Sequence, residues 1–314
     1  RALLLTLLML FSTSMVPFGA SIFHSDSSTL ISEEGIMEGS GNQGIEVLIY
    51  GNSYTSGNNL ANLVQDSLQN FDNSAVAQSL TSGGLKLSDH ATRVQTAGHQ
   101  WNTTLRNGNW NWVILQDQSQ VPSFPTSNQY WQESKDGSIV LDQMISDNGA
   151  QTVFLMTWGR RDGDSQNQWR NPDFLTMQAN LETGYMLYSE NTSTPSRQSW
   201  IAPTGLAFKH IYNDVLASGA TPEDSGNDFY NLFSSDGSHP SIYGSYLATC
   251  VIFSTITGVS SVGNSWPNSI SSSKALYLQE VASSTVFNET QNLVYPWMSN
   301  NYQNFGNGQS SINL

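Results

Sequence analysis

Short apolar segments alternate with longer amphipathic segments over most of this 314-residue chain, and this alternation limits the folds that it can adopt. Five apolar runs have the length and composition of β-strands, and each is followed by a polar or glycine-bearing loop and then by helical periodicity. They are residues 45–50, 74–79, 112–115, 152–156 and 199–202. Such alternation is typical of βα units that feed a parallel sheet. The sequence therefore predicts an α/β fold with about five parallel strands.

Amphipathic segments supply the predicted helices. Residues 60–68 repeat apolar side chains at i, i+3, i+4 and i+8, as a helix with one buried stripe does. Similar patterns cover roughly 139–146, 173–189, 207–217 and 241–257. Neither an internal repeat nor an interior linker is evident, so a single domain over 45–286 is favoured. Residues 287–314 turn to Asn, Gln, Tyr and Gly, and this C-terminal extension is expected to wrap the surface or trail off.

The N-terminal segment has the composition of a secretory leader. Arg1 precedes an apolar run over 2–11, and small and polar residues follow as far as Ala20. The run is shorter than the ~20 apolar residues of a membrane-spanning helix, which favours a signal peptide over 1–20. An amphipathic or buried N-terminal helix is the alternative. Residues 21–44 read as a linker, so we expect a secreted or periplasmic protein with no stable membrane span after leader removal.

The charge composition limits the classes of molecule that this protein is expected to bind. Charged residues make up 11% of the chain, and 25 acids against 11 bases give a formal net charge of -14. Such a surface does not neutralise phosphates, so neither nucleic acid nor an anionic membrane is expected as a partner. The single cysteine, Cys250, excludes an internal disulfide framework, a multi-cysteine zinc site and a CxxC redox pair. We expect no cofactor.

A serine follows the first predicted strand on a tight turn. The segment 51–60 reads GNSYTSGNNL and places Ser53 between a buried strand and a helix. Loops at the carboxyl ends of parallel strands converge on the ligand site. Ser53 is therefore a candidate nucleophile, with backbone N–H groups at the helix start facing a developing oxyanion. The alternative is a plain turn with a helix cap, because Ser and Asn are common there.

One of the five histidines stands out by its local sequence. His239 lies in the segment 234–241 (SSDGSHPS), ahead of a predicted helix. Asp236, three residues earlier in a glycine-containing loop, can turn back to accept the imidazole N–H, which fixes the tautomer and stabilises the imidazolium. The alternative is an Asp-Gly turn followed by a capping Ser241. The others are interpreted as linker, surface or packed side chains: His24, His90, His99 and His210.

Together these two signals resemble the SGNH hydrolase superfamily, also called the GDSL esterase/lipase group. Ser53, Asp236 and His239 have the same order and wide separation, and the resemblance spans roughly 45–258. It implies a three-layer α/β/α sandwich with a flavodoxin-like sheet and a catalytic triad made by these three residues. The motifs Gly-Asn-Ser-x-Thr, Leu-Gln-x-Gln-Ser and Asp-Gly-x-His-Pro-Ser are similar to a divergent branch with exported members.

The resemblance also implies an oxyanion hole. The N–H of Ser53 is one donor, and a glycine of the segment 82–85 (SGGL) is the second, with Gly84 preferred to Gly83. After the third strand, Gln118 takes the place of the family's asparagine, and its side-chain amide is the third donor.

The chain departs from the family pattern at three positions. Asn52 replaces the aspartate of Gly-Asp-Ser, Gln118 replaces the asparagine, and Ser119 replaces the aspartate after it. A second Gly-Asn-Ser tripeptide ends at Ser265, but it follows a Gly/Ser-rich loop instead of a strand and lies after the histidine. Ser265 is therefore rejected as the nucleophile.

The loop after the fourth strand concentrates polar and aromatic groups. Trp158 is a candidate for stacking on a sugar or aromatic group, and Arg160 or Arg161 for binding an anion. A loop salt bridge of Arg161 with Asp162 or Asp164 is the alternative. No calcium-loop motif accompanies the two aspartates, so no metal is assigned.

The sequence therefore predicts a secreted serine esterase that hydrolyses short-chain acyl or acetyl esters, on small molecules or on acylated glycans. Two rivals remain open: an acyltransferase that uses the same site, and a surface protein that binds glycans without catalysis.

Overall fold

The computed structural model describes residues 44–288 and 293–299. Its strands form one parallel sheet in the order β2-β1-β3-β4-β5. This is the flavodoxin-like order, so the predicted fold class and strand number are confirmed. Each strand begins within two residues of its predicted start: β1 (Glu46–Gly51), β2 (Val76–Thr81), β3 (Trp112–Leu115), β4 (Gln151–Leu155) and β5 (Trp200–Ala202).

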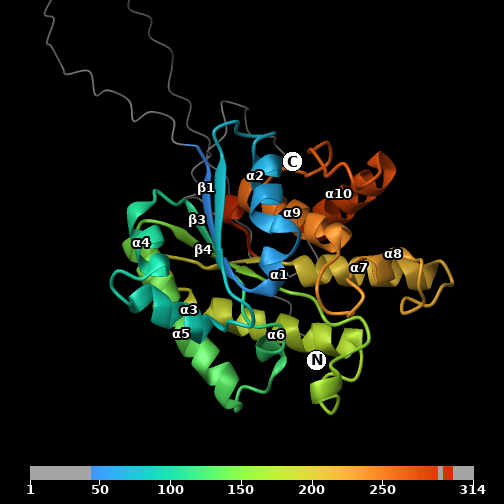
Figure 1. Ribbon diagram of the computed structural model, residues 1–314, viewed down its shortest axis with the longest axis horizontal. Coiled ribbons are helices and arrows are strands. Elements are labelled where there is room, and N and C mark those ends of the chain that lie inside the picture. The colour runs from blue at the N-terminus through green and yellow to red at the C-terminus, as the bar shows by residue number, and fades with distance from the viewer. Residues whose placement is uncertain (1–43, 289–292, 300–314) are drawn as a thin grey trace, which may run out of the picture. The chain divides into compact units, whose positions relative to one another are not determined.

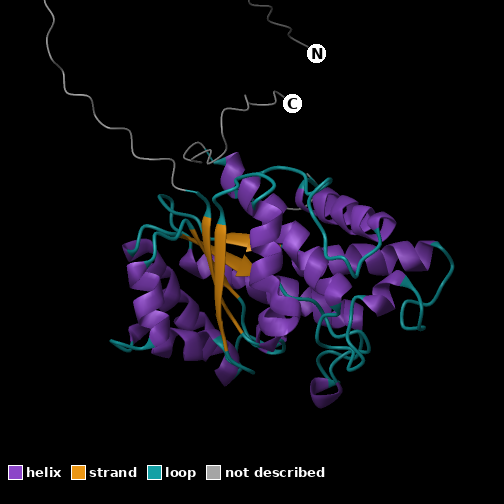
Figure 2. Ribbon diagram, turned by 45° about the horizontal axis from the view of Figure 1, so that its top comes forward, coloured by secondary structure: helices purple, strands orange, loops and turns teal. Residues whose placement is uncertain are grey.

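Helices cover both faces of the sheet, which Figure 2 shows between two helical layers. One face packs against α3 (Leu87–Gln95), α4 (Gln100–Asn107), α5 (Gln129–Asp147) and α6 (Phe174–Thr192). The other packs against α2 (Leu60–Leu68), α7 (Thr204–Ala217), α9 (Ile242–Thr257) and α10 (Ser272–Val286) (Figure 1). Short helices α1 (Ser53–Ser56) and α8 (Asp228–Asn231) complete the α-helices of the described part.

The period-2 alternation of strand side chains divides the core between the two layers. In β1, Val47 and Ile49 belong to the cluster under α2 and α9, whereas Leu48 and Tyr50 belong to the cluster under α3 and α5. All four side chains are fully buried. A strand that is buried on both faces has a continuous run of apolar residues. The sequence of β1 has such a run, and the strand is therefore predicted from the sequence alone.

Two of the longer helices, α5 and α10, differ from the sequence prediction. Helix α5 begins ten residues before the predicted start, at Gln129, where the Asn128 side chain accepts from the Tyr130 N–H. Gly137 lowers helix propensity in this part, yet the packing requires it, because a Cβ there would lie 2.6 Å from the Ser88 backbone nitrogen. Helix α10 was not predicted, since its Ser- and Thr-rich sequence is a weak helix former. Its apolar stripe is stabilised by packing on α9 and α7.

Part of the C-terminal extension belongs to the core. Tyr295 is 1% exposed and stacks on Trp297, with ring centroids 5.2 Å apart. Trp297 in turn packs against Gly258 at the end of α9. The predicted signal peptide over 1–20 and nearly all of the predicted linker over 21–44 lie outside the described residues. Within the described ranges, no helix is both long and apolar enough to cross a bilayer.

Candidate active site

Ser53 is the first residue of α1 and lies two residues after the end of β1. Asn52 caps this helix, because its side-chain oxygen accepts from the Tyr54 N–H at 3.1 Å. Gly51 allows the tight turn, since a Cβ at this position would lie 2.1 Å from Thr55 Oγ1. The chain therefore turns sharply from strand to helix at the carboxyl edge of the sheet, where Ser53 is partly exposed.

The three residues predicted to form a triad meet at this edge. His239 Nε2 lies 2.9 Å from Ser53 Oγ, and His239 Nδ1 lies 2.5 Å from Asp236 Oδ2. The other carboxylate oxygen of Asp236 accepts the backbone N–H groups of Ser238 at 2.9 Å and of His239 at 3.0 Å. These contacts arrange Ser53, His239 and Asp236 as a hydrogen-bonded chain.

The electrostatics of Asp236 favour its charged form. Partial burial acts to raise the pKa of this carboxyl, but hydrogen bonds from the His239 ring and from two backbone N–H groups outweigh it and hold the pKa below its usual range. The His239 side chain stays 43% exposed. The imidazole is thus held by an ionised partner while remaining open to a ligand.

The histidine loop is bound to the serine loop by contacts beyond the triad. The Tyr54 ring meets the His239 ring edge-on at 5.3 Å, and the Tyr54 hydroxyl lies 2.6 Å from Ser238 Oγ. Asn58, with φ of 52°, donates from its side chain to the Pro240 carbonyl at 3.1 Å. An asparagine tolerates this left-handed conformation better than most residues do. These contacts therefore fix the position of the histidine loop relative to the serine loop.

Trp158 lies on the loop after β4 as expected, but its ring is buried, so its predicted role in stacking on substrate is wrong. The ring is 1% exposed and lies between Tyr54, at 5.0 Å, and Phe208, at 4.5 Å, nearly parallel to both. Its Nε1 donates to the Ser238 carbonyl at 3.1 Å. Trp158 instead supports the histidine loop from beneath.

Asn52 connects the loops that follow three strands. It is 3% exposed, and its amide nitrogen donates to the carbonyls of Leu85 at 3.0 Å and Asp117 at 3.3 Å. An aspartate has no donor for these two carbonyls when ionised. The departure from Gly-Asp-Ser therefore has a structural reason in this chain.

The two candidate glycines of the oxyanion hole are exposed on the loop between β2 and α3. Gly84 has φ of 71°, the left-handed region that favours glycine. Ser82, just before them, donates its N–H to the Gly51 carbonyl at 3.3 Å, which ties this loop to the serine turn. The assignment of Gly84 or Gly83 as an oxyanion donor stays a prediction.

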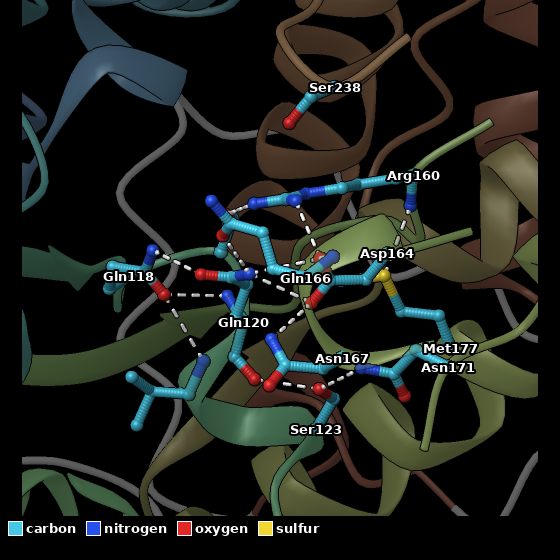
Figure 3. Close-up of polar contacts among 12 residues, drawn as sticks. Gln118, Gln120, Ser123, Arg160, Asp164, Gln166, Asn167, Asn171, Met177 and Ser238 are labelled. Carbon is cyan, nitrogen blue, oxygen red and sulfur yellow. Dashed lines mark hydrogen bonds and ion pairs between the residues drawn. The ribbon is translucent and has the colours of Figure 1, made fainter. Parts of the chain in front are cut away.

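The Gln118 amide has a fixed orientation. Its oxygen accepts the backbone N–H groups of Gln120 at 2.7 Å and Val121 at 3.3 Å, and its nitrogen donates to Gln120 Oε1 at 3.1 Å (Figure 3). The Gln120 amide nitrogen in turn lies within 3.0 Å of both Asp164 carboxylate oxygens and 2.9 Å from Gln166 Oε1. A primary amide carries two N–H groups, so Gln118 retains one beyond its bond to Gln120.

Asp117 is a supporting residue that the sequence analysis missed. Burial raises the pKa of this carboxyl to about 6, against the opposing effect of its hydrogen bonds. It accepts from the backbone N–H groups of Leu87 and Gln118 and from the hydroxyls of Ser134 and Tyr188. An acid two residues after the end of a fully apolar strand was the available signal. Asp117 fixes the start of the loop that carries Gln118.

The two arginines after β4 have different partners. Arg160 pairs with the buried Asp164 at 2.8 Å, and its other terminal nitrogen lies 3.4 Å from Ser119 Oγ. Arg161 pairs with Asp162 at 2.7 Å and donates its backbone N–H to the Gly237 carbonyl at 2.8 Å, within the histidine loop. The salt-bridge alternative is thus observed for Arg161, and the proposed substrate contact of Arg160 stays a prediction.

Other candidates do not converge on this edge. Ser265 bonds to Asn70 and to the Asp66 carbonyl beside α2, away from any histidine contact in the described ranges. The described residues contain no group of three or more His, Cys, Asp or Glu side chains suited to a metal ion. Cys250 is buried in α9, and burial raises the pKa of its thiol to about 12.

Comparisons with known proteins show which fold this chain has. No family model matches the chain, and no curated protein matches it. A protein of Slackia heliotrinireducens assigned to the SGNH hydrolases is 21% identical, with a TM-score of 0.52 over 67% of this chain and 97% of the neighbour. A DUF4886 family protein from Bacteroides uniformis is 14% identical, with a TM-score of 0.58 over 80% of this chain and 98% of the neighbour. The chain has the three-layer α/β/α fold of the SGNH hydrolases.

Proposed function

We propose that the protein is a serine esterase that hydrolyses short-chain acyl esters through an acyl-enzyme intermediate. The observation that carries the proposal is the His239 ring, which is hydrogen-bonded to Ser53 Oγ on one side and to the Asp236 carboxylate on the other. This is the arrangement that activates a serine hydroxyl as a nucleophile. It lies at the edge of the sheet where ligands bind in this class of fold.

In the proposed mechanism His239 Nε2 takes the Ser53 proton as Oγ attacks the ester carbonyl. Asp236 accepts the Nδ1–H throughout and stabilises the imidazolium. His239 then gives its proton to the leaving alcohol, which departs and leaves the acyl group on Ser53. Water attacks this second ester, His239 takes the proton of that water, and the acid is released as Ser53 regains its hydrogen.

In each tetrahedral intermediate the former carbonyl oxygen carries a negative charge, which hydrogen-bond donors must stabilise. We assign this role to the backbone N–H groups of Ser53 and Gly84 and to the second side-chain N–H of Gln118. The hydrogen bonds of Gln118 to Gln120 support the assignment, since they restrict the rotation of an amide one methylene longer than asparagine. We also propose export, on the leader-like composition of residues 1–20.

The test compares Ser53→Ala with the wild type on p-nitrophenyl acetate and butyrate. Removal of the nucleophile is expected to lower kcat by about 10⁴-fold or more and to abolish labelling by a fluorophosphonate probe. Ser265→Ala, in the second Gly-Asn-Ser tripeptide, is the matched control and should keep both signals. A Ser53→Ala variant that keeps most of its turnover contradicts the assignment. A wild type that neither turns over esters nor takes the label contradicts the esterase proposal.

A further inference from the structure

An exposed tryptophan lies on the loop that follows β4, the same loop that carries Arg160. Trp169 is 74% exposed, more than any other large hydrophobic side chain in the described ranges. Among those same residues, none stacks on its ring or places a cation over it. A large apolar ring left in water forgoes the favourable free energy of burial, which an incoming ligand can recover.

The backbone around Trp169 is held firmly, so a loose loop does not explain the exposure. Arg170 donates from Nε to the Ser123 carbonyl at 2.9 Å, and the Asn171 amide donates to Ser123 Oγ at 2.7 Å. On the other side, the buried Asp164 accepts from the Asn167 amide at 2.8 Å (Figure 3). The turn that carries the ring is therefore already ordered, which lowers the entropic cost of binding a ligand.

The polar groups beside this turn are mainly uncharged. The carboxamides of Gln118, Gln120 and Gln166 form a connected row, and Gln166 is exposed. Arg160, beside the row, is neutralised by its ion pair with Asp164, and the guanidinium of Arg170 donates to the Ser123 carbonyl. Amides offer both donors and acceptors without charge, so this surface suits a ligand with many hydroxyl groups better than an anion.

We propose that Trp169 and the adjoining amides form a carbohydrate subsite that binds the alcohol part of the ester. This inference rests on the proposed esterase function of Ser53. The C–H face of a pyranose ring covers the Trp169 indole, while its hydroxyls exchange hydrogen bonds with the exposed Gln166 amide. An acyl chain of a lipid would need a contiguous apolar surface, whereas Trp169 is an isolated aromatic ring among polar side chains.

The experiment measures kcat/KM on p-nitrophenyl acetate and on partially acetylated oligosaccharides of xylose, mannose and N-acetylglucosamine. With Trp169→Ala, kcat/KM on at least one oligosaccharide is expected to fall about tenfold relative to kcat/KM on p-nitrophenyl acetate, mainly through KM. Trp266→Ala is the matched control, because Trp266 is 43% exposed but lines a separate groove with Leu63 and Gln69. It should leave both activities unchanged.

A binding experiment that does not depend on turnover tests this inference separately from the esterase proposal. Deacetylated oligosaccharides are titrated into the Ser53→Ala protein with and without Trp169→Ala, and the indole fluorescence is followed. A fluorescence change that requires Trp169 supports the subsite even if no ester is hydrolysed. Equal effects of Trp169→Ala on all substrates, or oligosaccharide binding that is lost with Trp266→Ala instead, overturn the inference.

Discussion

Within the part of the chain that the structure describes, two groups of serine, histidine and aspartate can be compared, and one of the two has the geometry of a triad. In the group at the sheet edge, the His239 ring lies 2.9 Å from Ser53 and 2.5 Å from Asp236. In the second group, His210 Nδ1 lies 3.5 Å from Ser284 Oγ. His210 Nε2 lies 3.8 Å from Asp214 Oδ1.

The backbone explains the difference. Asp236 and His239 are three residues apart in a turn, where the carboxylate also accepts the His239 backbone N–H. His210 and Asp214 are four residues apart along α7, and Asp214 is already bonded to the Tyr277 hydroxyl at 2.8 Å. Helix neighbours of this kind form weak surface pairs.

The two serines differ in the same way. Ser53 begins a helix, whereas Ser284 lies within α10, where its hydroxyl donates to the Val281 carbonyl at 3.0 Å. Backbone N–H groups inside a helix are used by the helix itself and cannot serve an oxyanion. Proximity of the right residue types is therefore insufficient, and the turn and its available donors make the site.

The largest expected effect concerns the two histidines. His239→Ala should lower kcat on p-nitrophenyl acetate by about 10³- to 10⁴-fold, because the base is lost. His210→Ala, the matched change in the second group, should leave kcat within about twofold of the wild type. Steady-state kinetics on both variants check this. A comparable loss in both would show that the second group also takes part in the reaction.

The two aspartates provide the next test. Asp236→Asn should lower kcat by about 10²- to 10³-fold, since the amide neither stabilises the imidazolium nor fixes the productive tautomer. Asp214→Asn should have no such effect. The ratio of the two kcat values is the measurement, and a ratio near one would contradict the role given to Asp236.

A smaller effect is expected at Gln120, which has no counterpart in the second group. Gln120→Leu removes the hydrogen-bond partner of the Gln118 amide nitrogen, so kcat should fall about tenfold while KM changes little. Gln129→Leu, an exposed amide on α5, is the control and should be neutral. A rise in KM at constant kcat would instead indicate that Gln120 contacts the substrate, and thermal unfolding of both variants reports any loss of fold.

The smallest effect concerns stability against acid. The pKa of Asp236 is depressed in the folded state, so its ionised form stabilises the fold above its unfolded pKa of about 4, and this contribution disappears as the pH falls through the folded value. Asp236→Asn should therefore lose less stability than the wild type between pH 5 and pH 3. The Asp236 side chain is half exposed, so solvent screens its interactions. The wild type and the variant should therefore differ by ~0.5 kcal/mol at most in the free energy of unfolding that each loses between these pH values. Urea unfolding at the two pH values measures it, and a steeper loss in the variant would contradict the sign.

Much of this organisation was accessible from the sequence because it is local. The five strands are short apolar runs buried on both faces, and their pattern does not depend on which helix covers them. The turn at Ser53 and the three-residue spacing of Asp236 and His239 are likewise properties of single segments.

Other features depend on segments that are far apart in the chain. Trp158 looked like an exposed binding group, but the rings of Tyr54 and Phe208 bury it. Asp117 was overlooked because its burial and its donors come from α3, α5 and α6. Gln120 gained its role only when the loop after β4 brought Asp164 beside it.

The sequence by itself determined the fold class, the strand positions and the two segments that carry Ser53 and the Asp236–His239 pair. Only the tertiary structure decided that His239 and Ser53, 186 residues apart, lie within hydrogen-bond distance, and that His210 and Ser284 lack this geometry. The physical reason is that hydrophobic periodicity and short-range spacing depend only on residues that are close together in the sequence. Burial, the pKa of Asp117 and the direction of a side chain result from close packing between segments that the sequence does not place together.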